Sequence, residues 1–282
     1  MQDYDGRPCA VMIALHARRS AASVEQFHRR FPERPLIVAL TGTDLYDDIR
    51  TDPAAQHSIE VASCLVLLQP MGLSELPEHL RPRARVIYQS VRRPPGTFSP
   101  RRGVFEVCVL GHLRPVKDPF LAAQASRLLP RSSRVQIVHA GAALNNEMRD
   151  RARAEMRSNP RYRWLGELPR WKALRLLARS RLLVLSSVME GGANAISEAI
   201  AFSVPVLASR IPGSIGLLGE AYPGYFAVGD AGELAALLSR AETDPQFYKT
   251  LKRWCARLAA LVDPEGERKA WESVLHEVLA AA

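Results

Sequence analysis

Two glutamates eight positions apart, the first followed by a pair of glycines, stand out in the segment SSVMEGGANAISEAIAFSVPVLASR. Glu190 precedes Gly191 and Gly192, and Glu198 falls on the same face of the expected helix as Asn194. Carboxylates accept hydrogen bonds from sugar hydroxyls, whereas glycine amides at a helix start favour a negative charge between them. A nucleotide-sugar has this layout, with a hydroxylated group at each end and a diphosphate in the middle. A helix-capping Glu190 and a surface Glu198 would explain the same residues, so the interpretation depends on the surrounding elements.

A second polar cluster, GHLRPVKDP, follows an apolar run that ends at Leu110. Gly111 permits a tight turn there, and Arg114 and Lys117 come at the start of the next expected helix. Cations in that place can neutralise the charge that develops on a diphosphate leaving group. We therefore predict donor binding or catalysis by these residues in preference to simple solvation of a loop. His112 is either a hydrogen-bond donor to phosphate or a buried turn histidine.

A third candidate is RIPGSIGLLG, residues 210–219, which we expect to be a loop after a strand. Three glycines in such a loop can turn successive backbone amides toward an anion. This places Gly216 among the donor-binding candidates. An irregular connector is an equally good interpretation of the segment taken alone.

Two polar segments in the first hundred residues, ALHARRS and ALTGTDLY, each follow an apolar run. The carboxyl ends of parallel strands meet at one edge of a sheet, so we expect these polar groups to lie near one another. Paired guanidinium groups there suit an anionic acceptor. The alternative is that Asp44 and Ser20 cap helices, and for Ser20 capping is the better interpretation. The acceptor-side candidates are Arg18, Arg19, Thr41 and Asp44, with His16 as a catalytic candidate.

These segments lie in an alternation of short apolar runs and amphipathic stretches, which is typical of an α/β fold with parallel sheets covered on both faces. The expected strands are Ala10–Leu15, Leu36–Leu40, Cys64–Gln69, Arg85–Tyr88, Phe105–Leu110, Val135–Ala140, Arg163–Leu165, Leu182–Leu185 and Pro205–Ala208. The expected helices are Asp118–Leu129, Leu144–Arg157, Pro169–Ser180, Ala193–Phe202, Asp230–Ala241, Pro245–Leu261 and Glu265–Ala281.

The alternation is interrupted by SVRRPPGTFSPRRG, Ser90–Gly103, whose prolines, glycines and arginines exclude a helix or a central strand. We interpret this stretch as a linker between two Rossmann-like domains that face each other across a cleft. The first, at residues 1–100, is an acceptor-side domain that looks incomplete, and the second, at residues 101–264, binds the nucleotide-sugar donor. The helix expected at residues 265–282 is a candidate to pack back on the first domain.

The composition and charge of the chain indicate which partners and which kinds of site to expect. The net charge is +9, but residues 1–100 hold 12 Arg, no Lys and 11 acidic residues, so most of the excess lies in the rest of the chain. Without a basic stripe interleaved with aromatic residues, nucleic acid is not an expected partner. The four cysteines are scattered, which is typical of core thiols in a cytoplasmic protein and argues against a zinc site. We expect neither a signal peptide, because the first residues lack a basic region, nor a membrane span, because no apolar run has the required length.

The segments described above resemble those of a known family. The run from Glu190 to Arg210, together with GHLRPVKD and YPGYFAVGDAGELAALL (residues 222–238), is similar to the donor-binding domain of retaining-type glycosyltransferases of the B fold, the glycosyl transferases group 1. The similarity extends over nearly the whole chain and is most specific in the second half. It implies two Rossmann-like domains and glycosyl transfer from a nucleotide-sugar.

The resemblance also implies roles for individual residues. Glu190, with the amides of Gly191 and Gly192, would contact the donor sugar. Glu198 would contact the ribose hydroxyls, and Lys117 matches the diphosphate-binding lysine of the family.

The sequence departs from the family pattern at three places. His112 stands where the family usually has an arginine directly after the strand-end glycine, and Arg114 is a substitute for it. Thr41, in TGTD, stands where the family often has the histidine of an H-G-x-D motif, so that His16 is the candidate to replace it. The first domain also looks N-terminally shortened by about one strand–helix unit.

The combination of ALHARRSAASVEQF, VALTGTDLY and VLGHLRPVKDPFLAA resembles more narrowly the selenosugar synthase branch of selenoneine biosynthesis. That resemblance implies a UDP-sugar donor, with UDP-N-acetylglucosamine or UDP-glucose expected, and selenophosphate as the acceptor. The Arg18–Arg19 pair would suit the selenophosphate oxyanion. We expect neither a metal nor another cofactor, because the cations of the protein itself would hold the diphosphate. The alternatives are an O-glycosyltransferase acting on a lipid or small hydroxylated acceptor and a nucleotide-sugar-binding protein without catalysis.

Overall fold

The computed structural model describes residues 3–96 and 98–281, and contacts divide these residues into two compact units. Unit 1 comprises the described part of Met1–Ser90, the short segment Met189–Gly192 and the described part of Pro264–Ala282. Unit 2 comprises Val91–Val188, apart from Thr97, and Ala193–Asp263. Residues 1, 2, 97 and 282 belong to the predicted domain ranges and linker but lie outside the described residues.

Unit 1 is built on a four-stranded parallel sheet whose strands follow one another in chain order. The strands are β1 (Met12–Leu15), β2 (Leu36–Leu40), β3 (Cys64–Leu67) and β4 (Ala84–Val86). The α-helices of this unit are α1 (Ala21–Arg30), α2 (Ile49–Thr51), α3 (Pro53–Glu60) and α11 (Pro264–Ala280). A π-helical turn at Asp44–Asp48 follows β2, and 3-10 helices occupy Pro70–Glu75 and Glu78–Arg83.

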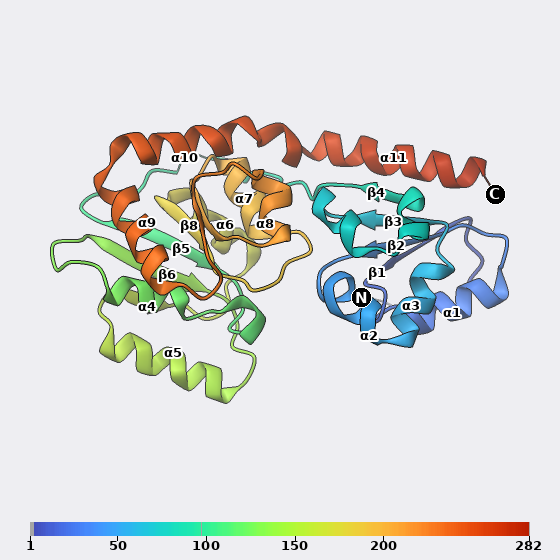
Figure 1. Cartoon of the computed structure of the whole chain (residues 1–282), viewed down its shortest axis with the longest axis horizontal. Coiled ribbons are helices and arrows are strands. Elements are labelled where there is room, and N and C mark those ends of the chain that lie inside the picture. The colour runs from blue at the N-terminus through green and yellow to red at the C-terminus, as the bar shows by residue number, and fades with distance from the viewer. Residues whose placement is uncertain (1–2, 97, 282) are drawn as a thin grey trace. The chain divides into compact units, whose positions relative to one another are not determined.

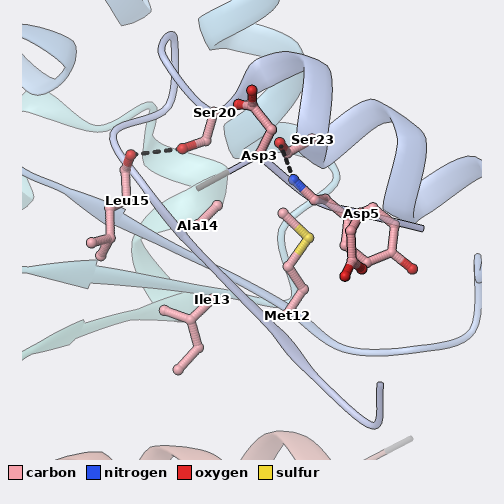
Figure 2. Close-up of a pocket in the computed structure, with 9 residues that line it drawn as sticks. Asp3, Asp5, Met12, Ile13, Ala14, Leu15, Ser20 and Ser23 are labelled. Atoms are coloured by element: carbon pink, nitrogen blue, oxygen red, sulfur yellow. Dashed lines mark hydrogen bonds between the residues drawn. The ribbon is translucent and has the colours of Figure 1, made fainter. Parts of the chain in front are cut away.

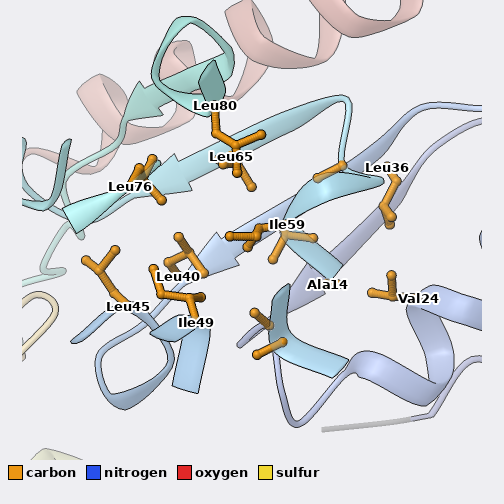
Figure 3. Packing of buried hydrophobic residues seen from close by; sticks show 14 of the residues in the cluster. Ala14, Val24, Leu36, Leu40, Leu45, Ile49, Ile59, Leu65, Leu76 and Leu80 are labelled. Carbon is orange, nitrogen blue, oxygen red and sulfur yellow. The ribbon is translucent and has the colours of Figure 1, made fainter. Parts of the chain in front are cut away.

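The inner strands β2 and β3 are buried on both faces, which explains why their sequences are continuous apolar runs. Leu36, Val38 and Leu40 of β2 point into a cluster that includes residues of α1 and α3 (Figure 3). The alternate residues Ile37 and Ala39 point to the other face, in a second cluster that includes residues of α11. Within this unit, Figure 1 shows α1–α3 on one side of the strands and α11 along the other.

Unit 2 is built on a six-stranded parallel sheet in the order β10-β9-β8-β5-β6-β7. The strands are β5 (Phe105–Leu110), β6 (Val135–Ala140), β7 (Tyr162–Trp164), β8 (Leu182–Leu185), β9 (Val206–Ser209) and β10 (Tyr225–Phe226). The α-helices are α4 (Leu121–Arg127), α5 (Asn146–Ser158), α6 (Arg170–Arg179), α7 (Asn194–Phe202), α8 (Pro212–Leu218), α9 (Ala231–Thr243) and α10 (Pro245–Arg257). Strand order reverses between β5 and β8, and in such sheets ligands bind outside the carboxyl ends of the strands at the reversal.

The predicted α/β class with parallel sheets is confirmed, and the expected strands are present within a few residues of their predicted bounds. Two local expectations are wrong. The predicted loop at 210–219 contains α8, and the helix expected from Asp118 begins at Leu121, after a 3-10 turn at Pro115–Lys117. β10 was not predicted, because two aromatic residues are too short a run to signal a strand. No helix among the described residues has the length and apolar character required to cross a membrane.

Candidate functional site

The loops after β5 and β8 are tied together at the point where strand order reverses in unit 2. The Oγ of Ser186 donates to the carbonyl oxygens of Lys117 and Asp118, at 3.0 and 2.9 Å. The backbone N–H of Val188 donates to the carbonyl of Val116 at 2.9 Å. Asp118 has a φ of 39°, in the left-handed region, which closes the 3-10 turn. These bonds fix the cationic loop that was predicted to hold the diphosphate.

Within that loop, Arg114 is exposed and Lys117 is half-buried. Arg114 directly precedes the 3-10 turn, so its backbone is extended while the next three residues curl back toward β8. Burial raises the pKa of Asp118, and Arg151 opposes that rise. The loop therefore places cations at the carboxyl end of β5, as expected from its sequence.

Gly111 and His112 form the turn directly after β5. The Nδ1 atom of His112 accepts a hydrogen bond from the N–H of Ala142, at 2.9 Å, and the histidine is exposed. The interpretation of His112 as a buried turn histidine is therefore wrong. Because Nδ1 is used as an acceptor, the proton of the neutral ring is on Nε2, which is the tautomer that can donate to a phosphate oxygen.

Glu198 is buried on α7, with 8% of the residue exposed. Its Oε1 lies 3.2 Å from the Nη1 of Arg170 at the start of α6. Burial raises the pKa of Glu198, and the Arg170 guanidinium opposes that rise. The interpretation of Glu198 as a surface glutamate is wrong. Asn194, one turn earlier, is exposed as the first residue of α7.

The segment that carries Glu190, Gly191 and Gly192 follows β8 in the chain but groups with unit 1. Glu190 is half-buried and lies three residues before Ala193, the N-cap position of α7. A Cβ atom added to Gly191 would lie 2.5 Å from the carbonyl carbon and oxygen of Thr41, also in unit 1. Gly191 therefore allows a close approach of two backbones, and Gly192 allows a close approach of the Leu68 side chain. The sequence pattern did not distinguish these uses of glycine from an approach to a ligand.

Gly216 lies inside α8, so the predicted anion-binding loop at 210–219 is not formed. Gly216 instead lines an apolar groove of about 380 Å³, together with Leu217, Leu218 and Trp254 among others. Pro212 at the first turn sets the backbone angle of a helix, which explains the difference from the expected loop. Nothing in this geometry supports contact of Gly216 with an anion.

In unit 1, Asp44 joins the ends of β1 and β2. Its fully buried carboxylate accepts hydrogen bonds from the N–H groups of Ala17, at 3.0 Å, Thr41, at 2.9 Å, and Gly42, at 2.7 Å. A carboxylate with three amide donors organises backbone and has little capacity left for an acceptor. Asp44 is therefore placed to shape the predicted acceptor side, while Thr41 is exposed beside it.

His16 follows β1 with a φ of 76°, in the left-handed region, and only 5% of the residue is exposed. Its Nε2 lies 3.1 Å from the Oγ1 of Thr43. Carboxylate oxygens of Asp44 and Asp48 lie 3.8 Å from its two ring nitrogens. A non-glycine residue held in this conformation is uncommon and is often found at functional sites.

The two arginines after His16 have different surroundings. Arg18 pairs with Asp48, at 3.2 Å, and with Asp52, at 2.9 Å, so its charge is largely offset. Arg19 is exposed. Ser20 is the N-cap residue of α1, as expected, but its side chain makes no capping hydrogen bond, and its Oγ donates to the carbonyl of Leu15 at 2.7 Å.

A cavity of about 430 Å³ opens beside β1 in unit 1 (Figure 2). It is lined by Asp3, Tyr4, Asp5, Met12, Ile13, Ala14, Leu15, Ser20 and Ser23. None of these was a predicted site residue, so the cavity adjoins the acceptor-side candidates without containing them. No group of three His, Cys, Asp or Glu side chains within residues 3–96 and 98–281 is arranged to hold a metal ion.

Sequence reasoning missed three residues that organise the site in unit 2: Ser186, Arg170 and the buried His139, which bonds to the carbonyl of Gly111. Arg170 comes 28 residues before its partner, and no local pattern links the two positions. Ser186 and His139 lie at the carboxyl ends of their strands, and that position was the available signal.

The comparisons with known proteins agree with this geometry. Residues 99–256, more than half of the chain, match the family model for glycosyl transferases group 1. The HepE protein of Anabaena, solved in complex with UDP and glucose, superposes with a TM-score of 0.78 at 16% identity, covering 95% of this chain and 78% of that one.

Two further solved structures have the same fold. Sucrose-phosphate synthase from Thermosynechococcus elongatus has a TM-score of 0.75 at 18% identity, with 97% of this chain and 74% of that one covered. A UDP-forming α,α-trehalose-phosphate synthase from Burkholderia vietnamiensis has a TM-score of 0.75 at 13% identity, with 95% and 72% covered. The family match and the shared fold together identify this chain as a member of the glycosyl transferases group 1 and as a glycosyltransferase.

Proposed function

We propose that this glycosyltransferase uses a UDP-sugar as donor and selenophosphate as acceptor, forming a carbon–selenium bond. The observation that supports the donor class most directly is the construction of unit 2 at its strand reversal. There the cation-bearing loop after β5 is fixed to β8, and a buried carboxylate, Glu198, is held on the following helix. Similar structures were solved with UDP, with UDP-glucose, or as UDP-forming synthases.

In the proposed reaction, the bond between the anomeric carbon and the diphosphate oxygen breaks, and its electron pair leaves with UDP. A lone pair on the selenium of selenophosphate forms the new bond to carbon. Positive charge develops on the sugar and negative charge on the diphosphate. Lys117 and Arg114 would stabilise the latter, because cations fixed before the reaction lower the energy of a developing anion.

We propose the following donor-binding roles for the other candidate residues. In unit 2, which includes most of the donor-binding domain proposed at 101–264, Glu198 would accept hydrogen bonds from the ribose hydroxyls. Asn194, Gly111 and His112 would line the donor site. The segment with Glu190, Gly191 and Gly192 would contact the donor sugar.

On the acceptor side, proposed at residues 1–100, Arg19 is the stronger candidate to hold the selenophosphate oxyanion, because Arg18 already faces two carboxylates. His16 is the catalytic candidate there, with Thr41 and Asp44 beside it. Selenium is a soft nucleophile that needs little activation, so the proposal does not require a strong general base.

Mass spectrometry tests the proposal. The protein is incubated with UDP-N-acetylglucosamine, UDP-glucose and fresh selenophosphate under reducing, anaerobic conditions. A selenium isotope pattern on a hexose or N-acetylhexosamine mass is the expected result and identifies the sugar. Sugar transfer to hydroxylated acceptors, with none to selenophosphate, would instead indicate an O-glycosyltransferase. Binding of UDP without any release of UDP from the donors would indicate a nucleotide-sugar-binding protein.

A further inference from the structure

A buried imidazole lies beneath the turn after β5. His139 of β6 is 1% exposed, and its Nε2 lies 2.9 Å from the carbonyl oxygen of Gly111. Its Nδ1 lies 3.0 Å from the hydroxyl of Tyr162 on β7. Burial lowers the pKa of His139 to about 4, so the ring is neutral at pH 7.

These two contacts determine which nitrogen of His139 carries the proton. A carbonyl oxygen only accepts, so Nε2 carries the hydrogen and donates to Gly111. Nδ1 then accepts from the Tyr162 hydroxyl, and burial raises the pKa of Tyr162 so that this hydroxyl keeps its proton. The carbonyl of Gly111 is thus held toward the interior of unit 2.

The orientation of this carbonyl determines where the next amide points. The peptide between Gly111 and His112 is planar and trans, so its C=O and N–H point in opposite directions. With the carbonyl turned toward His139, the N–H of His112 points away from it. In the described part of the chain, no carbonyl or side chain accepts a hydrogen bond from this N–H.

The neighbouring loop reinforces the arrangement. A Cβ atom on Gly141 would lie 1.9 Å from the carbonyl oxygen of Gly111, so only a glycine allows the two loops to approach this closely. The N–H of Ala142 donates to Nδ1 of His112, which leaves the ring proton on Nε2. His112 therefore presents two donors at the carboxyl end of β5, its backbone N–H and its ring Nε2–H.

We propose that His139 is a positioning residue: by holding the Gly111 carbonyl inward, it orients the N–H of His112 to donate to an anionic oxygen, beside the Nε2–H of the same residue. This inference rests on the proposed function, in which that oxygen belongs to the diphosphate of the donor. Such donors are effective because they are oriented before the ligand arrives and because hydrogen bonds to charged oxygens are strong.

Nuclear magnetic resonance on the wild-type protein tests the geometry directly. Two-bond proton–nitrogen spectra should show the Nε2–H tautomer for both His139 and His112. Addition of UDP should move the amide proton of His112 strongly downfield. An Nδ1–H tautomer at His139, or an amide of His112 that does not respond while UDP binds, would overturn the inference. This measurement needs no variant, so it decides the question even if a substitution at the buried position unfolds the chain.

Calorimetric titration with UDP tests the consequence. His139→Phe removes the donor to Gly111 and should weaken UDP binding about tenfold or more. His139→Gln should restore the affinity to within about threefold, because its amide can donate to Gly111 and accept from Tyr162. Tyr162→Phe is the matched control: it removes a buried hydrogen bond to the same ring but leaves Nε2–H in place, and it should change UDP affinity by about twofold at most.

The outcomes separate the two proposals. If the wild type binds UDP and folded His139→Phe binds it equally well, His139 has no positioning role, while the proposed function is unaffected. If His139→Phe and Tyr162→Phe weaken binding equally, the effect is general loss of packing and the inference is wrong. A wild-type protein that does not bind UDP would overturn both the inference and the proposed donor.

Discussion

The Nη1 atom of Arg170 lies 3.2 Å from Oε1 of Glu198, yet the two side chains differ greatly in their contact with water: 65% of the Arg170 side chain is exposed, against 11% for Glu198. Water solvates the guanidinium well, so most of the desolvation cost of the pair falls on the carboxylate. That cost raises the pKa of Glu198, and the arginine reverses it only in part. A charged group kept in such a place at a cost in stability is a common property of binding sites.

Glu198→Gln should therefore stabilise the protein at pH 7 while weakening donor binding. A raised folded-state pKa means that the contribution of Glu198 to stability is fully present below its unfolded pKa and is lost as pH rises through the folded value. The variant lacks this loss, so its free energy of unfolding at pH 7 should exceed that of the wild type by about 0.5–2 kcal/mol. UDP affinity should fall about tenfold, since an amide replaces a charged acceptor of hydroxyl groups.

Urea unfolding at pH 4 and pH 7, with calorimetric titration of UDP, checks this prediction. The exposed Glu220, which pairs with Arg210 on the surface, provides the control Glu220→Gln, and neither quantity should change there. A Glu198→Gln protein that is less stable than wild type at pH 7 but equal to it at pH 4 would show that the ion pair stabilises the fold, contrary to this argument.

Much of the fold was predictable because its signals are local. Continuous apolar runs such as Leu36–Leu40 and Leu182–Leu185 predict buried parallel strands, and both are found where expected. The segment 210–219 was misjudged because its glycines outweighed the proline that begins α8. Glycine tolerates many conformations, so its presence permits a loop without requiring one.

The site was less predictable than the fold. The position of Lys117 in the loop after a strand and that of Glu198 on a helix could be inferred from sequence order alone. The burial of Glu198 could not be inferred from sequence order, and this burial distinguishes it from an ordinary helical glutamate. The partners of Arg18 could not be inferred either. The carboxylates of Asp48 and Asp52 are 30 or more residues away along the chain, and only folding brings them near Arg18.

Lys117→Ala should slow turnover more than it weakens binding. A cation that stabilises charge developing on the leaving group acts mainly in the transition state, so kcat should fall about 10²–10³-fold while KM for the UDP-sugar changes less. Arg114 is more exposed, and Arg114→Ala should have a smaller effect of the same kind. Steady-state release of UDP measures both, and the exposed Arg131→Ala is the control. If Lys117→Ala lowers kcat/KM but leaves kcat unchanged, Lys117 contributes only to ground-state binding.

Arg19→Ala should impair selenophosphate use more than Arg18→Ala does. Arg18 already pairs with Asp48 and Asp52, so its removal frees two carboxylates but removes little net attraction for an anion. KM for selenophosphate should rise about tenfold for Arg19→Ala and about threefold or less for Arg18→Ala, as expected for loss of one charge-assisted contact. The exposed Arg29→Ala on α1 is the control. If the double variant at 18 and 19 retains wild-type affinity, the proposed acceptor site is in the wrong place.

At His16, backbone and ring effects can be separated with two variants. The left-handed φ of 76° favours glycine, so His16→Gly should be more stable than His16→Ala by about 1 kcal/mol, the reverse of their usual order. Both variants remove the ring, so a catalytic contribution of His16 should lower kcat about 10²-fold in each. Thermal unfolding and steady-state rates measure the two effects. Equal stability of the variants would contradict the argument from the backbone, and unchanged kcat in both would remove His16 from the catalytic candidates.

Gly141→Ala should lower the stability of the fold, whereas Gly111→Ala should lower the affinity for UDP, although the two glycines are in contact. A Cβ at position 141 would lie 1.9 Å from the carbonyl oxygen and 2.4 Å from the carbonyl carbon of Gly111, which are backbone atoms that cannot move aside alone. Gly141→Ala should therefore lower the free energy of unfolding by about 3 kcal/mol, as expected for strong overpacking.

At position 111, no heavy atom lies within 4 Å of an added Cβ, and Gly111 does not have a positive φ, so Gly111→Ala should change stability by about 0.5 kcal/mol at most. Its methyl group would instead occupy space at the end of β5 where the diphosphate is proposed to bind, and UDP affinity should fall. Thermal unfolding and UDP titration of both variants decide the matter. A Gly111→Ala protein with wild-type stability and wild-type affinity for UDP would show that the diphosphate does not approach this turn.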